Sequence, residues 1–144
     1  MPISKSRINQ NSIDYCKILT ARTCQIYDSI GSIYCPILKE KVIFNARGFH
    51  HLLYGPDGTP RNVRERIYKL TLFPLAILTI KNATSVDEER DIGVRTSRKK
   101  NALLKKGKTY ALTATVGRKD PVAARVIILK IGTGNLIFWS IMKN

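Results

Sequence analysis

The last third of the chain holds three runs of β-forming residues at the spacing of a β-meander. The runs Lys108–Val116, Ala124–Ile131 and Leu136–Met142 are rich in Val, Ile, Thr, Tyr and Phe. Segments 117–121 and 132–135, both containing glycine, separate them at distances typical of hairpins. The pattern therefore predicts three consecutive antiparallel strands. A further strand is expected at Asp91–Thr96.

An amphipathic helix is predicted near the start of the chain. From Ser12 to Ile30, apolar residues recur at intervals of three and four, which places them on one helical face. Ser12 has the side chain of an N-cap, and Gly31 can end the helix. The polar residues 1–11 before it are expected to form a loose arm.

A strand and a second helix are predicted before residue 55. Val42–Phe44 is a β-rich run and is expected to be the first strand. Ala46–Tyr54 follows with the periodicity of a helix. The segment 55–60 is rich in Gly and Pro, which indicates a loop.

A third helix is predicted after this loop. Thr59 can cap it, Pro60 suits its first position, and Val63, Ile67 and Leu70 give it an apolar stripe. Pro74 is expected to interrupt it, because proline lacks the backbone N–H of the helical ladder. Residues 75–82 are then expected either to restart as a helix or to form a strand.

Helices thus precede the strands along the chain. That segregation predicts an α+β fold in which N-terminal helices pack on a C-terminal antiparallel meander sheet. The 144 residues suit a single domain, 1–144, with 12–30 as an accessory helix.

The chain is strongly basic. It has 25 Lys and Arg against 10 Asp and Glu, a formal net charge of +15. Such an excess favours a nucleic-acid partner, although a merely soluble basic surface is the alternative. An acidic patch at 87–91 precedes a run of cations, and this region is expected to be an exposed loop. The cations of that run are Arg98, Lys99, Lys100, Lys105, Lys106 and Lys108.

Several classes of protein are not indicated. No apolar run reaches the roughly 18–20 residues of a membrane span, and the N-terminus lacks a signal peptide's apolar core, so we expect a cytoplasmic protein. The three cysteines Cys16, Cys24 and Cys35 have no zinc-ligand spacing, and buried thiols are the default. No P-loop, dinucleotide fingerprint or G-x-S-x-G motif occurs. We therefore expect neither a metal nor a cofactor.

The only two histidines, His50 and His51, are adjacent and lie in the second predicted helix. At about 100° per residue, Phe49, Leu52 and Leu53 share the side expected to face the sheet. Arg47, His51 and Tyr54 fall on the opposite side, with His50 at the edge. Imidazole can move protons near neutral pH, whereas the alternative is two ordinary, partly buried histidines.

Histidine and cations are sufficient for RNA cleavage without a metal. A neutral His can remove the proton of a 2′-OH, which then attacks phosphorus and leaves a 2′,3′-cyclic phosphate. Arg61, Arg64 and Arg66, at the start of the third helix, could hold the phosphate, although Arg66 is nearest the apolar stripe. Ser140 could bond a phosphate oxygen or fill a tight core position. Residues expected to contact RNA are Arg47, Tyr54, Arg66, Thr113, Arg98, Lys99, Lys100, Lys105, Lys106 and Lys108.

These segments together resemble the superfamily of small nucleases that includes barnase, EndoU, colicin-type tRNases and RelE-type toxins. The resemblance covers about 36–143 and is closest to the phage- and mobile-element-associated branch. It is carried by strand 42–44, the Gly48–Leu52 helix, the Arg-bearing helix from Arg61, and Phe138–Ile141. It implies metal-independent cleavage of tRNA or mRNA, frequently as a toxin. It also implies functional roles for His51, for Arg61 or Arg64, and for Ser140.

The leading hypothesis is a toxin-like endoribonuclease with His51 as general base or acid and His50 as its substitute. Arg47, Arg61 and Arg64 would hold phosphate, with Ser140 assisting. RNA is the expected partner, and an acidic antitoxin or immunity protein would suit the charge. Two alternatives stand: a non-catalytic basic RNA-binding protein, and a structural or assembly protein of a mobile element. On the last strand, Trp139 and Ser140 are expected on opposite faces, with Trp139 in the core.

Overall fold

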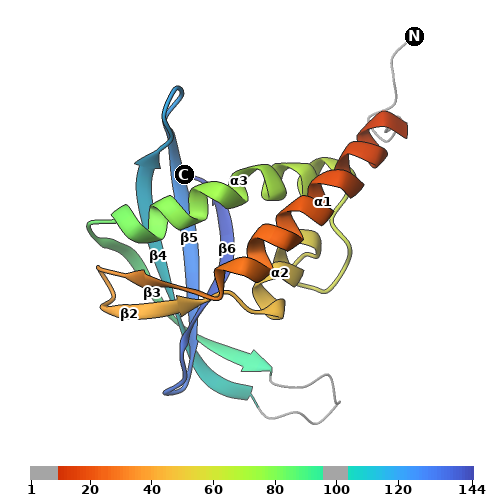
Figure 1. Ribbon diagram of the computed structural model, residues 1–144. Coiled ribbons are helices and arrows are strands. Elements are labelled where there is room, and N and C mark those ends of the chain that lie inside the picture. The colour runs from red at the N-terminus through yellow and green to blue at the C-terminus, as the bar shows by residue number, and fades with distance from the viewer. Residues whose placement is uncertain (1–9, 96–103) are drawn as a thin grey trace.

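The computed structural model describes residues 10–95 and 104–144, which form three helices and six strands. The helices are α1 (Gln10–Ile30), α2 (Ala46–Leu53) and α3 (Val63–Asn82). The strands are β1 (Ser32–Cys35), β2 (Glu40–Ile43), β3 (Val86–Arg95), β4 (Leu104–Val116), β5 (Val122–Ile131) and β6 (Leu136–Lys143). The helices pack against one side of the sheet, as Figure 1 shows, so the fold is α+β.

The sheet has the order β1-β2-β6-β5-β4-β3. Every neighbouring pair is antiparallel except β2 and β6, which run parallel. The predicted meander of β4, β5 and β6 is confirmed. Residues 91–95 of the strand expected at 91–96 are part of the longer β3, and Thr96 lies outside the described residues. The chain thus returns from the far edge of the sheet and inserts β6 beside the early strand β2 (Figure 1).

Aromatic side chains from helices and strands meet in the core. Tyr27 of α1 is only 1% exposed, and its ring contacts Phe44, Phe73 and Phe138 at centroid distances of 5.3 to 6.2 Å. Its hydroxyl donates to the backbone oxygen of Asn45 at 2.6 Å. The phenol therefore fixes the start of α2 to α1 while its ring joins the core.

The boundaries of α1 and the first strand differ from the prediction. Gln10 and Asn11, assigned to the loose arm, belong to α1, so Ser12 is not its N-cap. The Gln10 side chain donates to Asp14 one turn on, which supports the earlier start. The rest of the expected arm, 1–9, lies outside the described residues. Gly31, with φ of 67°, does follow the helix end.

The first strand is β1, which the prediction missed, and β2 ends at Ile43. Phe44 lies outside the strand, and its N–H donates to the Gly31 oxygen instead. This bond holds the chain where it leaves the β1–β2 hairpin and turns towards α2.

Helix α3 begins later than predicted. Thr59 and Pro60 are engaged in the preceding loop, where Thr59 bonds Asp57 and Pro60 bridges to Tyr54. Asn62 is the N-cap instead, and its side chain accepts from the Glu65 N–H at 2.9 Å. The side-chain amide of Asn62 also donates to the Glu65 carboxylate at 3.1 Å, which holds the two side chains together at the start of the helix.

Helix α3 also continues through Pro74, contrary to the predicted interruption. An internal proline costs a helix about 3 kcal/mol. Pro74 is exposed, whereas Leu70, Phe73, Ala76 and Ile80 are at most 1% exposed in the core. Because apolar burial on both sides of the proline requires one continuous helix, packing offsets the lost hydrogen bond.

The acidic patch and part of the basic stretch are strands and not an exposed loop. Residues 87–91 lie in β3, and Lys105, Lys106 and Lys108 lie in β4. Lys108 Nζ is 2.7 Å from Glu89 and 3.9 Å from Asp91 on the paired strand. Opposite charges facing each other across the pair thus support this edge of the sheet. No helix among residues 10–95 and 104–144 is long and apolar enough to cross a membrane.

An irregularity in β6 changes which residues face the core. The β5–β6 register shifts between Ile127 and Ile128, which places the extra residue, Trp139, in a bulge. Phe138 and Ile141 are both 0% exposed in the core, although they are three residues apart. The predicted alternation is therefore wrong here: Trp139 and Ser140 both lie outside the core and line one cavity.

Candidate functional site

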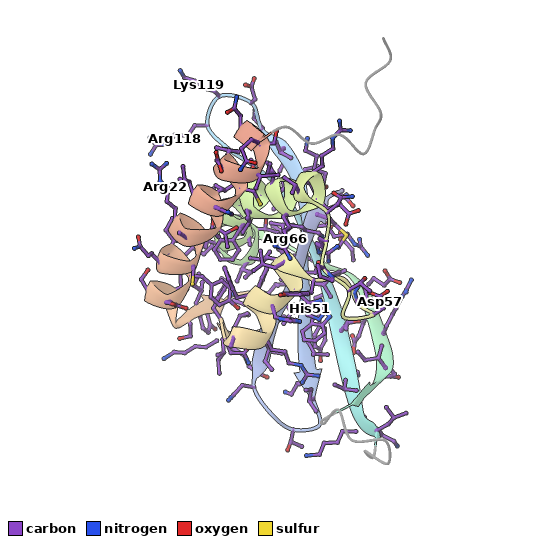
Figure 2. All side chains as sticks on the ribbon, turned by 90° about the vertical axis from the view of Figure 1, so that its right-hand side faces the viewer. Arg22, His51, Asp57, Arg66, Arg118 and Lys119 are labelled. Atoms are coloured by element: carbon purple, nitrogen blue, oxygen red, sulfur yellow. The ribbon has the colours of Figure 1, made fainter. Side chains whose placement is uncertain are left out.

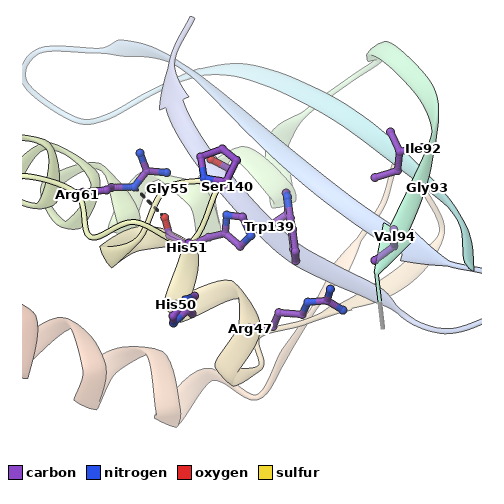
Figure 3. Close-up of a pocket in the computed structure, with 12 residues that line it drawn as sticks. Arg47, His50, His51, Gly55, Arg61, Ile92, Gly93, Val94, Trp139 and Ser140 are labelled. Atoms are coloured by element: carbon purple, nitrogen blue, oxygen red, sulfur yellow. Dashed lines mark hydrogen bonds between the residues drawn. The ribbon is translucent and has the colours of Figure 1, made fainter. Parts of the chain in front are cut away.

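A cavity of about 510 Å³ lies between α2, the loop after it, β3 and the bulge of β6. We call it the site cavity, and Figure 3 shows its lining side chains. Among the described residues, the lining contains two arginines, both histidines and a serine, but no Asp or Glu. The lining residues are Arg47, His50, His51, Gly55, Pro56, Gly58, Arg61, Ile92, Gly93, Val94, Trp139 and Ser140.

Gly48 allows α2 to lie directly against β6. A Cβ at this position would come within 2.4 Å of both the Phe138 oxygen and the Tyr27 hydroxyl. The helix is capped by Asn45, whose side chain accepts from the Gly48 N–H at 3.2 Å. Close approach and cap together fix the position from which α2 presents Arg47 and His51.

His51 and Arg47 both contact Trp139 of β6. The His51 and Trp139 ring centroids are 3.8 Å apart, and the Arg47 guanidinium carbon lies 5.3 Å from the indole centroid. His51 was expected on the face opposite the sheet, but the bulge turns Trp139 out of the core towards it. The prediction that Trp139 is a core residue is wrong for the same reason.

The two histidines differ in environment. His51 is half-buried, whereas His50 is exposed and stacks on Tyr54 at a centroid distance of 4.1 Å. Burial lowers the pKa of His51 to about 4, and the nearby charges of Arg61, His50, Arg47 and Lys69 act in the same direction. His51 is therefore neutral at pH 7, with a ring nitrogen able to accept a proton.

Arg61 enters the site cavity, but the other two arginines of this segment do not. Its Nε donates to the His51 oxygen at 3.1 Å, as the dashed line in Figure 3 shows. Arg64 is exposed on α3 and does not line the cavity. Arg66 donates to the Leu53 oxygen at 3.2 Å and lies over Tyr54, so it supports the end of α2. Tyr54 itself does not line the cavity.

Lys69 is the residue that the sequence prediction missed. It is 9% exposed, and its Nζ donates to the Ile141 oxygen at 2.6 Å and to Ser140 Oγ at 3.3 Å. Burial lowers its pKa to about 8; Arg61 adds to this effect and Glu65 opposes it. Among the described residues, no carboxylate forms an ion pair with the Lys69 ammonium. The sequence carried one signal for this residue. Lys69 lies in helical phase with the apolar residues Phe73 and Ala76, which indicates that it shares their face of the helix.

The remaining predicted RNA contacts are dispersed. Thr113 Oγ1 is buried without a hydrogen-bond partner in the described part of the chain, and Thr113 does not line the site cavity. Lys105 and Lys106 are exposed on β4 and pair in register with Val94 and Gly93 of the cavity wall. Lys108 is engaged by the two acids of β3. Arg98, Lys99 and Lys100 lie outside the described residues.

Groups of three or more His, Cys, Asp or Glu side chains placed to hold a metal are absent from residues 10–95 and 104–144. Cys16, Cys24 and Cys35 are free thiols. No family model, curated protein or solved structure matches this chain.

Proposed function

We propose that the protein is a metal-independent endoribonuclease that acts on RNA in the cytoplasm, in the manner of a toxin nuclease. One observation carries the proposal: a half-buried, neutral His51 stands with Arg47, Arg61 and Ser140 in one cavity, and Lys69, which does not line that cavity, donates to Ser140. Such a cavity attracts an anion, and it offers a proton acceptor next to the place where that anion would bind.

His51 would take the proton of the ribose 2′-OH. The 2′-oxygen would then form a bond to phosphorus, the bond from phosphorus to the 5′-oxygen would break, and a 2′,3′-cyclic phosphate would remain. Arg47 and Arg61 would balance the charge that gathers on the phosphoryl oxygens. Because a bound phosphate offsets the surrounding cations, it would also raise the pKa of His51 and make it a stronger base.

The departing 5′-oxygen needs a proton. Ser140 lines the cavity and accepts a hydrogen bond from Lys69 Nζ. With its lowered pKa, the Lys69 ammonium would be a stronger acid than an ordinary lysine. The hydroxyl of Ser140 would pass its proton to the 5′-oxygen and take one from Lys69. Exchange with water would then restore both His51 and Lys69.

Incubation of the purified protein with end-labelled tRNA and mRNA in EDTA tests the proposal. We expect fragments with cyclic-phosphate ends, and no cut where the attacking ribose is replaced by 2′-deoxyribose. His51→Ala should lower the cleavage rate roughly 10²–10⁴-fold, as loss of a general base does, with RNA binding retained. His50→Ala should cost less than tenfold, because His50 is exposed and stacks on Tyr54. Undiminished cleavage by His51→Ala would refute the assignment.

A non-catalytic RNA-binding protein is the second candidate, and the low pKa of His51 favours it, because a group with a pKa of about 4 is a weak base. This candidate predicts salt-sensitive RNA binding and intact RNA after prolonged incubation. RNA cleavage would then be zero in both the wild-type protein and the His51→Ala variant, whereas the nuclease proposal predicts cleavage by the wild-type protein.

A further inference from the structure

A groove of about 480 Å³ lies between α1, α2 and α3, which sit together on one side of the sheet (Figure 1). We call it the helix groove. Phe49 of α2 and Val63 and Arg66 of α3 line it opposite α1. The lining residues of α1 recur at intervals of three and four, so they share one helical face. They are Ile13, Cys16, Lys17, Thr20, Ala21 and Cys24.

The helix groove is apolar, long and narrow. Ile13, Phe49 and Val63 give it hydrocarbon surface, and the Phe49 ring is held by Tyr27 of the core at a centroid distance of 5.2 Å. From Ile13 to Cys24 the groove follows about 16 Å of helix. A partner helix about 10 Å wide, enclosed over that length, would fill roughly 1,200 Å³, more than twice the volume of the groove. A single hydrocarbon chain is thin enough to be enclosed.

Two cations from different walls indicate the charge of the ligand. Lys17 of α1 and Arg66 of α3 line the helix groove, and its described lining contains no Asp or Glu. The Nε of Arg66 donates to the Leu53 oxygen, so the two terminal nitrogens of the guanidinium would bind an anion. Asp28 accepts a hydrogen bond from the Cys24 thiol and lies outside the lining. The groove thus combines an apolar surface with positive charge.

We propose that the helix groove binds a free long-chain fatty acid, with the hydrocarbon chain along α1 and the carboxylate on Lys17 and Arg66. The planar fork of an arginine matches the two oxygens of a carboxylate. Burial of the chain would strengthen binding about fourfold per methylene group. A neutral chain would leave both cations without an anion, and a cationic chain would be repelled.

Isothermal titration calorimetry with octanoate, decanoate and dodecanoate tests the burial of the chain. We expect Kd to fall about fourfold with each added methylene group. Decanol and decylammonium have the same chain length as decanoate and should bind at least about tenfold more weakly. The net charge of +15 would attract any carboxylate, so an affinity that does not depend on chain length would overturn the proposal.

Variants of α1 test the position of the ligand. Lys17→Gln should weaken decanoate binding about tenfold, as loss of a hydrogen bond to a charged group does. Arg22→Gln is the matched control, because it removes the same charge from an exposed residue of α1 that does not line the helix groove. It should change Kd by less than about twofold.

Ala21→Phe keeps every charge but fills the helix groove from its α1 wall. Because Ala21 is exposed, the larger side chain should leave the thermal midpoint of unfolding unchanged while it abolishes decanoate binding. Arg66 is a poorer choice for substitution, since it also supports the end of α2. An unchanged Kd in either Lys17→Gln or Ala21→Phe would overturn the proposal.

The thiol of Cys24 provides a second measurement of position. Cys24 is half-buried and lines the helix groove, whereas Cys16 and Cys35 are buried. Decanoate should slow alkylation of Cys24 by iodoacetamide, followed by mass spectrometry, in proportion to the fraction of protein bound. An unchanged rate at saturating decanoate would place the fatty acid elsewhere and overturn the site. None of these measurements involves RNA, and the helix groove shares no described lining residue with the site cavity, so this inference and the proposed function can fail separately.

Discussion

At the residue scale, the site is built from two groups that burial pushes towards their neutral forms. The pKa of His51 is lowered to about 4 and that of Lys69 to about 8, each chiefly by burial. One is therefore neutral at pH 7 and the other is still protonated. Between these two values the protein holds a proton acceptor and a proton donor at the same time, as general acid–base catalysis requires.

This difference predicts the pH dependence of the proposed RNA cleavage. Below about pH 4, protonated His51 can no longer accept a proton; above about pH 8, Lys69 has lost its charge. We expect kcat/KM to be nearly constant between these limits and to fall on either side. On the acid side, kcat should begin to fall at a higher pH than kcat/KM does, because bound phosphate raises the pKa of His51.

Initial rates on a fluorogenic RNA in EDTA, from pH 3.5 to 10, measure both limbs. Lys69→Met should lower the plateau and abolish the alkaline limb, whereas Ser140→Ala should lower the plateau and keep that limb. An alkaline limb that persists unchanged in Lys69→Met would assign it to another group.

The sequence was informative about some site residues and misleading about others. His51, Arg47, Arg61 and Ser140 were predicted and do meet in one cavity. Arg64 and Arg66 were grouped with Arg61 because all three are near one helix start, but helical phase separates them. The hydrogen-bond partners of Lys69 could not be predicted, because they belong to β6, about 70 residues further along the chain.

At the element scale, the contact between α2 and β6 determines the site. Gly48 lies where the helix meets the Phe138 backbone, and one turn of α2 further on, His51 reaches Trp139. Gly48→Ala would place a methyl group 2.4 Å from both the Phe138 oxygen and the Tyr27 hydroxyl. The backbone oxygen belongs to a paired strand and cannot move aside, so α2 must shift.

We expect Gly48→Ala to lower the free energy of unfolding by about 2–3 kcal/mol, as overpacking does. Urea denaturation measures it. Gly93→Ala is the comparison, because its nearest neighbour, a Leu104 methyl carbon, lies at 3.5 Å, an ordinary contact. It should cost less than about 1 kcal/mol. Equal stability of the two variants would show that α2 does not depend on close approach at Gly48.

Periodicity predicted the meander and α2 well and the irregular elements poorly. The meander and α2 were evident because turn residues and periodic apolar positions agree. β1 is only four residues long at a sheet edge, and Tyr34, at 55% exposed, gives it little apolar signal. A bulge such as that at Trp139 breaks the two-residue period, so strict alternation assigned Trp139 and Ser140 to opposite faces.

At the scale of the whole molecule, the charge is spread beyond the site. Figure 2 shows Arg118 and Lys119 at an end of the molecule away from His51 and Asp57. Lys105 and Lys106, by contrast, pair with the strand segment that lines the site cavity. If RNA binds at the site, these two pairs of cations should contribute unequally to its affinity.

The salt dependence of RNA binding distinguishes them. For single strands, the logarithm of the association constant falls with log salt by about 0.7 per phosphate contact. The double variant Lys105→Gln with Lys106→Gln should reduce the slope by about 1.4 if each lysine makes one such contact. Arg118→Gln with Lys119→Gln makes the same charge change and should reduce it by less than half as much. Anisotropy titrations between 50 and 300 mM salt measure both slopes. Equal reductions would place the RNA elsewhere on the basic surface.

The central position of β6 has a consequence for when the site cavity can form during synthesis. β6 pairs with both β2 and β5, and it carries Trp139 and Ser140 into the site cavity. A nascent chain can form α1, α2 and α3 and begin to pair β3, β4 and β5. Until residues 136–143 have left the ribosome, however, β2 cannot pair with the meander, and the site cavity lacks the residues that β6 contributes to it. A protein that cleaves RNA would thus stay harmless to the ribosome translating it until this strand emerges.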